Sequence, residues 1–205
     1  SFTLKNTEGQ QSIRFRTLFK HPVFLRFMAA TFLMQISFAP FYGFFILYCR
    51  DLGYSGVTSG MMIALAVLAE IIAFFYAGKV LRRFSYRVLL TLCYGLTVIR
   101  WLMVAYLAQH WYWLAFSMLF HAASFALAHS CAMQFIQNFF APAQRSRGQA
   151  LYAGVVYGGG GAIGAYCAGV LWADGPGATR AFVVVQGCLA EKRPSVAALA
   201  ATLMA

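Results

Sequence analysis

The chain has 205 residues, of which 61% are apolar and only 10% are charged. Soluble globular domains contain roughly 45–50% apolar and about 25% charged residues, so this composition excludes a water-soluble fold and indicates that lipid is the solvent. The formal net charge is +11, but the basic residues lie in short clusters between apolar stretches, which excludes nucleic acid as a partner and is typical of loops that face anionic lipid.

Apolar stretches of the length that crosses a bilayer, about 20 residues, predict an all-α fold, a polytopic membrane helix bundle with five full transmembrane helices and an incomplete sixth. We expect a cytoplasmic linker at 1–22, a transmembrane half-bundle at 23–190 and an atypical or truncated tail at 191–205. The full spans are expected at about 22–49, 57–81, 86–108, 111–139 and 149–173. In the first of them, Pro40 predicts a kink or local unwinding.

The basic residues also predict the orientation of the spans. Lys and Arg are in excess in the lead-in and in the links after the second and fourth spans, whereas the links after the first and third spans carry no net charge. Basic loops stay on the cytoplasmic side of a membrane. We therefore expect a multi-pass protein with a cytoplasmic amino terminus.

The fifth span is rich in glycine, and some of its glycines are four residues apart, a spacing that lets helix backbones approach closely in lipid. We expect a helix-packing surface made of Gly154, Gly158, Gly160, Gly161 and Gly164. The run does not fit a phosphate-binding loop, because no Lys-Ser/Thr pair follows the glycines and no strand precedes them.

Ionisable residues inside the spans are the main candidates for function, because charges are costly in hydrocarbon and normally face protein or a water-filled cavity. Glu70 lies near the middle of the second span, and Arg100 lies within the third. We interpret Glu70 as a group that takes up and releases a proton, and Arg100 as the partner of a carboxylate or an anionic substrate. The alternative is that the two charges neutralise one another and hold helices together.

The fourth span carries a polar strip. At 100° per residue Ser117, His121 and Ser124 fall on one narrow face, and His129 lies about 80° to one side. Such a strip can line a wet cavity, and histidine changes its charge near neutral pH. The alternative is that each histidine is neutral and donates a hydrogen bond to a neighbouring helix.

On the first span, Gln35 and Tyr42 lie in an aromatic-rich stretch and are candidates for contact with an organic substrate; a lipid-facing or packing surface is the competing interpretation. The five cysteines are dispersed, without the spacing of a metal site or a disulfide framework. No catalytic sequence motif is present. We therefore expect no enzyme activity, no metal and no cofactor.

The basic link at 78–87 has the glycine and arginines that major facilitator transporters carry between the second and third helix of each half. Further matching segments are 41–45, 68–71, 100–101, 120–122 with His129, 147–152 and 169–172. Together they resemble the carboxyl-terminal half of the 3-phenylpropionate permease group, proton-linked uptake proteins of the bacterial inner membrane. The resemblance covers about 24–182, and it implies that the five spans are helices seven to eleven of a twelve-helix transporter.

This resemblance implies proton-coupled uptake of a small organic solute, an aromatic carboxylate such as 3-phenylpropionate, in partnership with an amino-terminal half-transporter. Glu70, Arg100 and His121 are also similar to the coupling set of lactose permease, a more distant relative, and we count His129 with them. Where that permease has a further carboxylate, this chain has Ser124. Two alternatives stay open: a gene fragment that transports nothing, and a membrane-embedded enzyme or scaffold that uses the two histidines as ligands.

Overall fold

The computed structural model of the chain describes residues 21–172, 179, 181 and 182. Within these residues all regular structure is helical, and five helices are long and apolar enough to cross a membrane. The prediction of an all-α membrane bundle is confirmed. Most of the predicted linker, much of the incomplete sixth span and the predicted tail lie outside the described residues.

The first three spans are single helices: α2 (Pro22–Asp51), α3 (Gly56–Arg83) and α4 (Tyr86–Leu107). The fourth span is built from three consecutive helical segments: α5 (Trp111–His121), the π-helical η1 (Ala122–Leu127) and α6 (Ala128–Phe139). The fifth span is built from four: the 3₁₀ turn η2 (Pro142–Gln144), α7 (Arg145–Tyr152), the π-helical η3 (Ala153–Gly160) and α8 (Gly161–Trp172).

Two details differ from the sequence-based expectation. Helix α2 is continuous through Pro40, so the predicted local unwinding is wrong, and looser winding occurs instead in η1 and η3. The fifth span also begins earlier than predicted, because Arg145 and Arg147, which we assigned to a link, belong to α7. Pro142 explains this early start, since the fixed backbone angle of proline suits the first position of a helical turn.

The two links between the first three spans are short, and in each a serine side chain starts the following helix. Ser55 accepts a hydrogen bond from the backbone N–H of Thr58 at 3.1 Å, and Ser85 accepts one from Val88 at 3.4 Å. Each serine occupies the N-cap position and satisfies a backbone donor that the helix cannot. Gly53, with φ of 86°, makes the turn before Ser55. Neighbouring helices in the chain are therefore antiparallel.

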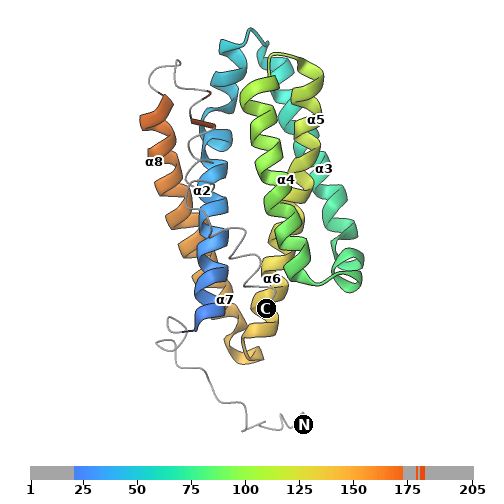
Figure 1. The fold of residues 1–205 in the computed structure, drawn as a ribbon, viewed down its shortest axis with the longest axis vertical. Helices are drawn as coiled ribbons and strands as arrows, with labels where there is room; N and C mark the ends of the chain where they lie inside the picture. Colours follow the sequence, from blue (N-terminus) through green and yellow to red (C-terminus); the bar gives the residue numbers. More distant parts are fainter. Residues whose placement is uncertain (1–20, 173–178, 180, 183–205) are drawn as a thin grey trace, which may run out of the picture.

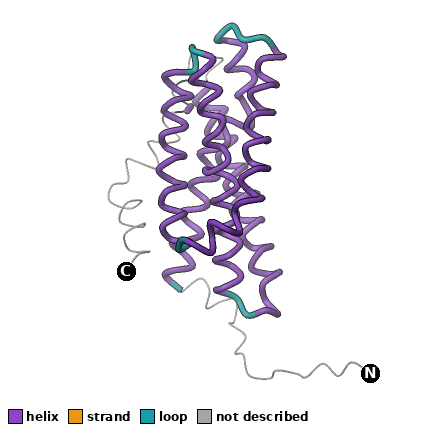
Figure 2. The backbone as a smooth tube through the Cα atoms, turned by 90° about the vertical axis from the view of Figure 1, so that its right-hand side faces the viewer, coloured by secondary structure: helices purple, strands orange, loops and turns teal. Residues whose placement is uncertain are grey.

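The spans form two groups, which stand side by side in Figure 1. Helix α2 packs against η3 and α8, whereas α3 and α4 pack against α5 and η1. Figure 2 shows the elongated outline of the bundle, with the links gathered at its two ends. Between α2 and α4 the contact is made by long side chains, such as the Tyr48 hydroxyl, which donates to the Val104 carbonyl at 2.9 Å.

Two glycines bring the fifth span close to α2. A Cβ at Gly164 would lie 2.7 Å from the Ala39 Cβ and 2.8 Å from the Ile36 carbonyl oxygen, and one at Gly160 would lie 3.2 Å from the Phe32 carbonyl oxygen. The other three glycines that we assigned to helix packing do not make such contacts within the described residues. Gly154 and Gly161 have nothing within 4 Å, and Gly158 meets only a backbone oxygen of its own span.

We predict that Gly164→Ala destabilises the bundle by about 1–3 kcal/mol, because the added methyl group must push α2 away. The measurement is thermal unfolding of the purified protein in detergent. Gly161→Ala is the matched control, since the same methyl group meets nothing there and replaces a poor helix former, for a gain of up to about 1 kcal/mol. Equal melting temperatures for the two variants would contradict the close approach of α8 to α2.

Candidate functional site

The guanidinium group of Arg100 lies where the two groups of helices meet. Its side chain is 0% exposed, and none of its three nitrogens has a hydrogen-bond partner among the described residues. Its central carbon lies 4.3 Å from the ring centre of Trp101, 4.5 Å from that of Phe41 and 5.6 Å from that of Phe38. Aromatic ring faces stabilise a cation, but they do not replace the oxygen acceptors that a buried guanidinium needs.

The aromatic residues around Arg100 are held by contacts between α2 and α4. The Trp101 indole N–H donates to the Ser37 hydroxyl at 3.3 Å, and Ser37 donates in turn to the Met34 carbonyl at 2.6 Å. Both Phe38 and Trp101 are almost fully buried, and their rings meet edge to face with centres 5.2 Å apart. The ring faces next to the guanidinium are therefore fixed by the packing of two spans rather than by flexible loops.

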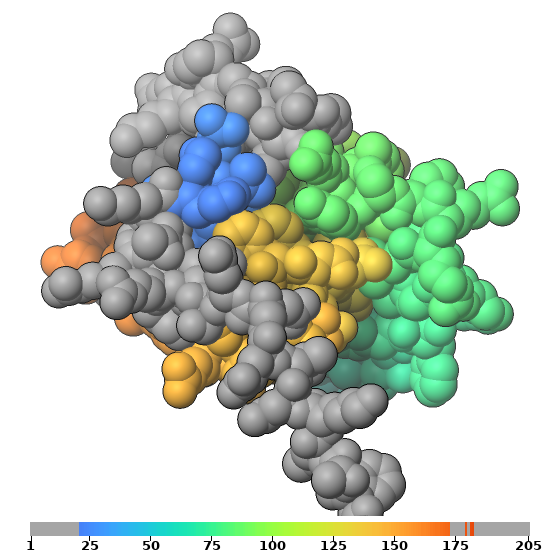
Figure 3. Space-filling view, turned by 90° about the horizontal axis from the view of Figure 1, so that it is seen from below, coloured from blue at the N-terminus to red at the C-terminus, as the bar shows by residue number. Residues whose placement is uncertain are grey.

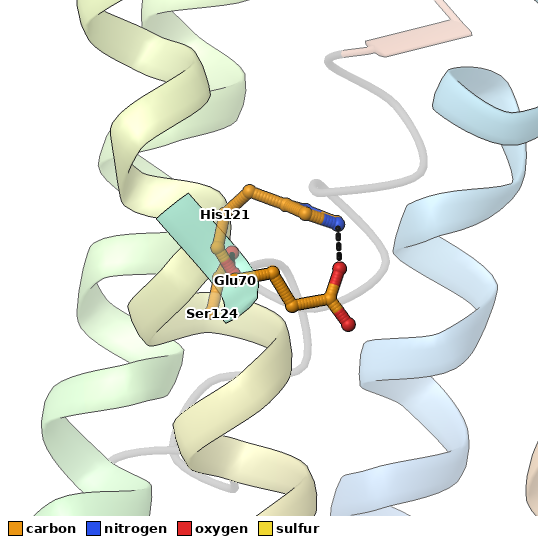
Figure 4. Close-up of polar contacts among 3 residues, drawn as sticks. All are labelled: Glu70, His121 and Ser124. Carbon is orange, nitrogen blue, oxygen red and sulfur yellow. Dashed lines mark hydrogen bonds and ion pairs between the residues drawn. The ribbon is translucent and has the colours of Figure 1, made fainter. Parts of the chain in front are cut away.

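Glu70 and His121 meet beside this aromatic cluster. The Glu70 Oε2 atom lies 3.5 Å from His121 Nε2, as the dashed line in Figure 4 shows. The His121 side chain is 3% exposed and that of Glu70 is 18% exposed. The separation is long for a hydrogen bond and suits an ion pair if the ring is protonated. No ion pair joins Glu70 to Arg100 among the described residues, so the structure does not contain the mutual neutralisation that we considered as an alternative.

Phe41 and Tyr42 connect the buried arginine to the surface of the half-bundle. The Phe41 ring lies against the guanidinium and has its centre 5.5 Å from that of His121. The Tyr42 ring centre is 6.4 Å from that of His121, and its side chain is 55% exposed. The site thus has a closed end at Arg100 and an accessible edge at Tyr42 and Glu70.

The remaining polar candidates are Ser117, Ser124 and Gln35. Ser117 and Ser124 are fully buried, and their hydroxyls donate to carbonyls of their own span, those of Leu114 at 2.6 Å and His121 at 3.4 Å. Gln35 is half-buried, and its Cβ lies where α2 packs against Gly160. The structure therefore places Gln35 at a contact between helices, and both serines within about one helical turn of His121 on the fourth span.

His129 belongs to the same aromatic surface as His121, because each is four residues from Phe125 and side chains four residues apart are neighbours on a helix. Both rings stack on Phe125, at 5.4 Å with an interplanar angle of 10° for His121 and at 6.3 Å with 11° for His129. The 80° offset assumes an α-helix, whereas η1 lies between the two histidines and has the wider i→i+5 winding. The Nδ1 atom of His129 also lies 2.9 Å from the Tyr157 hydroxyl, which joins the fourth span to the fifth.

Sequence reasoning did not identify Tyr157, Phe38 or Ser37, because each reads as an ordinary residue of an apolar span. Among the described residues no three His, Cys, Asp or Glu side chains come together in a group that could hold a metal ion. A metal site that used His121 and His129 would therefore have no third ligand in this part of the chain.

Ionisable groups held inside a membrane bundle mark the paths of substrates and ions, and the fold and the site are those expected in the class of membrane transport proteins. The family model described as "MFS_1 like family" matches residues 3–184, and the chain belongs to this family of the major facilitator transporters. It is 36% identical over 151 residues to a probable 3-phenylpropionic acid transporter of Escherichia coli (strain K12). The match covers 72% of this chain and 38% of that relative, and no solved structure matches the chain significantly.

We predict that Tyr157→Phe lowers the stability of the bundle by about 0.5–1.5 kcal/mol, the usual net value of a hydrogen bond, because His129 loses its partner on the fifth span. Thermal unfolding in detergent measures this loss. Tyr166→Phe, which removes a hydroxyl from a side chain that is 74% exposed, is the control and leaves the melting temperature unchanged. If both variants melt alike, the contact between His129 and Tyr157 does not hold the spans together.

Proposed function

We propose that this chain is the carboxyl-terminal half of a proton-coupled importer for a small aromatic carboxylate. The solute binds near the middle of the membrane, between this half and an amino-terminal half, as in transporters built from repeated halves. The family and the substrate named for the relative support this proposal. Residues 1–22 then belong to the cytoplasmic loop that joins the halves, and the protein lies in the bacterial inner membrane.

The observation that carries the proposal is the buried, unpartnered guanidinium of Arg100 among aromatic rings. A carboxylate is the natural complement of a guanidinium, because two parallel N–H···O bonds join them. An aromatic ring on the same solute gains from packing against the neighbouring rings of Phe41 and Tyr42. A solute that combines the two groups therefore matches both parts of the site, whereas a sugar or a nucleoside lacks the negative charge that Arg100 demands.

Coupling to protons follows from the net charge of the site. When the site is empty, Arg100 and ionised Glu70 sum to zero with His121 neutral. When a carboxylate binds Arg100 and a proton binds Glu70, the sum is again zero. With only the solute or only the proton bound, one uncompensated charge remains in a poorly solvated site, which is costly. Only the empty and the fully loaded forms therefore change conformation readily. The solute and the proton must then cross the membrane together, which is symport.

The cytoplasmic placement of the amino terminus rests on the distribution of basic residues. At the end of the bundle shown in Figure 3, the starts of α2, α4 and α7 and the end of α3 come together. This end carries a cluster of cations: Lys79, Arg82, Arg83, Arg87, Arg145 and Arg147. At the other end the last turn of α2 has Arg50 next to Asp51, with Nε and Oδ1 3.9 Å apart. The positive-inside rule supports placing the cationic end in the cytoplasm.

We predict that Glu70→Gln abolishes accumulation against a gradient but leaves downhill exchange measurable, because the neutral amide mimics a permanently protonated carboxyl group. The assay is uptake of labelled 3-phenylpropionate into cells that co-express the amino-terminal half, with and without a proton gradient. Asp51→Asn, which removes a carboxylate at the far end of α2, is the control and accumulates solute normally.

Unchanged accumulation by Glu70→Gln would reject Glu70 as the proton carrier. Failure of the unmodified chain to support uptake in either condition, despite a folded complex of the two halves, would instead favour a fragment that transports nothing.

We predict that Arg100→Gln weakens binding of 3-phenylpropionate by about 10- to 100-fold, because hydrogen bonds to a charged group contribute about 1.5–3 kcal/mol. Binding of the uncharged amide of the same acid changes little, so the preference for the carboxylate is lost. Equilibrium binding to the purified complex of both halves measures the two affinities. Arg50→Gln, at an exposed position, is the control; equal losses for acid and amide would show that Arg100 has only a structural role.

A further inference from the structure

The outer face of α3 carries a shallow groove that the transport site does not use. It has a volume of about 560 Å³ and is lined by Ile72, Phe75, Tyr76 and Lys79. Phe75 is 81% exposed, and α3 is the least buried of the five spans that the structure describes. Large apolar side chains with this exposure are stable only against lipid or another protein surface.

The groove points away from the site. At 100° per residue, its four lining residues lie within about 60° of the direction opposite to Glu70 on α3. Glu70 faces inward, because it contacts the buried His121. What binds in the groove is therefore in contact with the outer surface of this half and not with the solute.

Cations lie at one end of the groove. The Lys79 ammonium is 5.4 Å from the ring centre of Tyr76, and Arg82 and Arg83 follow within about one turn on the same face. All three side chains are exposed, and no carboxylate of the described residues lies within the 4.0 Å of an ion pair with them. Their charge is thus left for a partner outside this part of the protein.

We propose that this groove binds one anionic phospholipid. An acyl chain lies along Ile72 and Phe75, and the phosphate meets Lys79 and Arg83, with Tyr76 at the depth of the interface. Tyrosine prefers this depth in membranes, and basic residues attract anionic headgroups there. The proposal depends on the groove facing the bilayer, and it does not depend on the solute or on proton coupling.

The test is native mass spectrometry of the full chain in detergent with equal amounts of dioleoyl phosphatidylglycerol and dioleoyl phosphatidylcholine. We expect the unmodified protein to retain phosphatidylglycerol preferentially. A basic residue near an anionic surface contributes about 1 kcal/mol, which is about fivefold in affinity. The double variant Lys79→Gln/Arg83→Gln should therefore bind phosphatidylglycerol about 25-fold more weakly and lose its preference.

Two further variants separate the groove from the general positive charge. Arg26→Gln/Arg147→Gln removes two charges from the same end of the bundle, on α2 and α7, and should keep the preference. Phe75→Ala removes an exposed apolar wall without disturbing the core; it should weaken both lipids severalfold and leave their ratio unchanged.

Three results would overturn the proposal. The first is equal retention of both lipids by the unmodified protein. The second is an equal loss of phosphatidylglycerol by the two double variants, which would indicate attraction by the overall positive charge of this end; the third is displacement of the lipid by the amino-terminal half, which would show that protein covers the groove.

Discussion

The guanidinium of Arg100 is fully buried. Among the described residues it is surrounded by aromatic ring faces and has no hydrogen-bond partner. This one charge constrains the bundle, because α2 and α4 must stay far enough apart to hold it and close enough to exclude lipid. Long side chains meet that requirement: Trp101 reaches Ser37, and Tyr48 reaches the carbonyl of Val104. Close approach through small residues occurs on the other side of α2, where Gly160 and Gly164 meet it.

The aromatic rings around Arg100 also lie between it and the carboxylate of Glu70. Glu70 approaches from α3 and contacts His121, while the rings of Phe38 and Phe41 lie against both His121 and Arg100. A direct ion pair between Glu70 and Arg100 would satisfy both charges within the protein and leave neither for an exchangeable partner. In the transport proposal, this separation by aromatic rings lets Arg100 respond to the solute and Glu70 to the proton.

The spans were predictable from the sequence because hydrocarbon imposes length and composition on a helix so strongly that boundaries agree within a few residues, except at the start of the fifth span. The position of Glu70 and Arg100 within helices of membrane-spanning length was predictable for the same reason. Their partners were not, since contacts between helices depend on rotation and winding that composition does not encode. The π-helical winding of η1, which lies between the two histidines, has no signal in the apolar stretch around it.

The two loosely wound segments have a mechanical consequence. Helices bend most readily where their hydrogen-bond ladder is irregular, and η1 and η3 are such places in the fourth and fifth spans. His129 lies just beyond η1 and Tyr157 lies within η3, so their contact couples one compliant point to the other. A change in the bend of one span is thereby passed to the other, so that the fourth and fifth spans move together rather than independently.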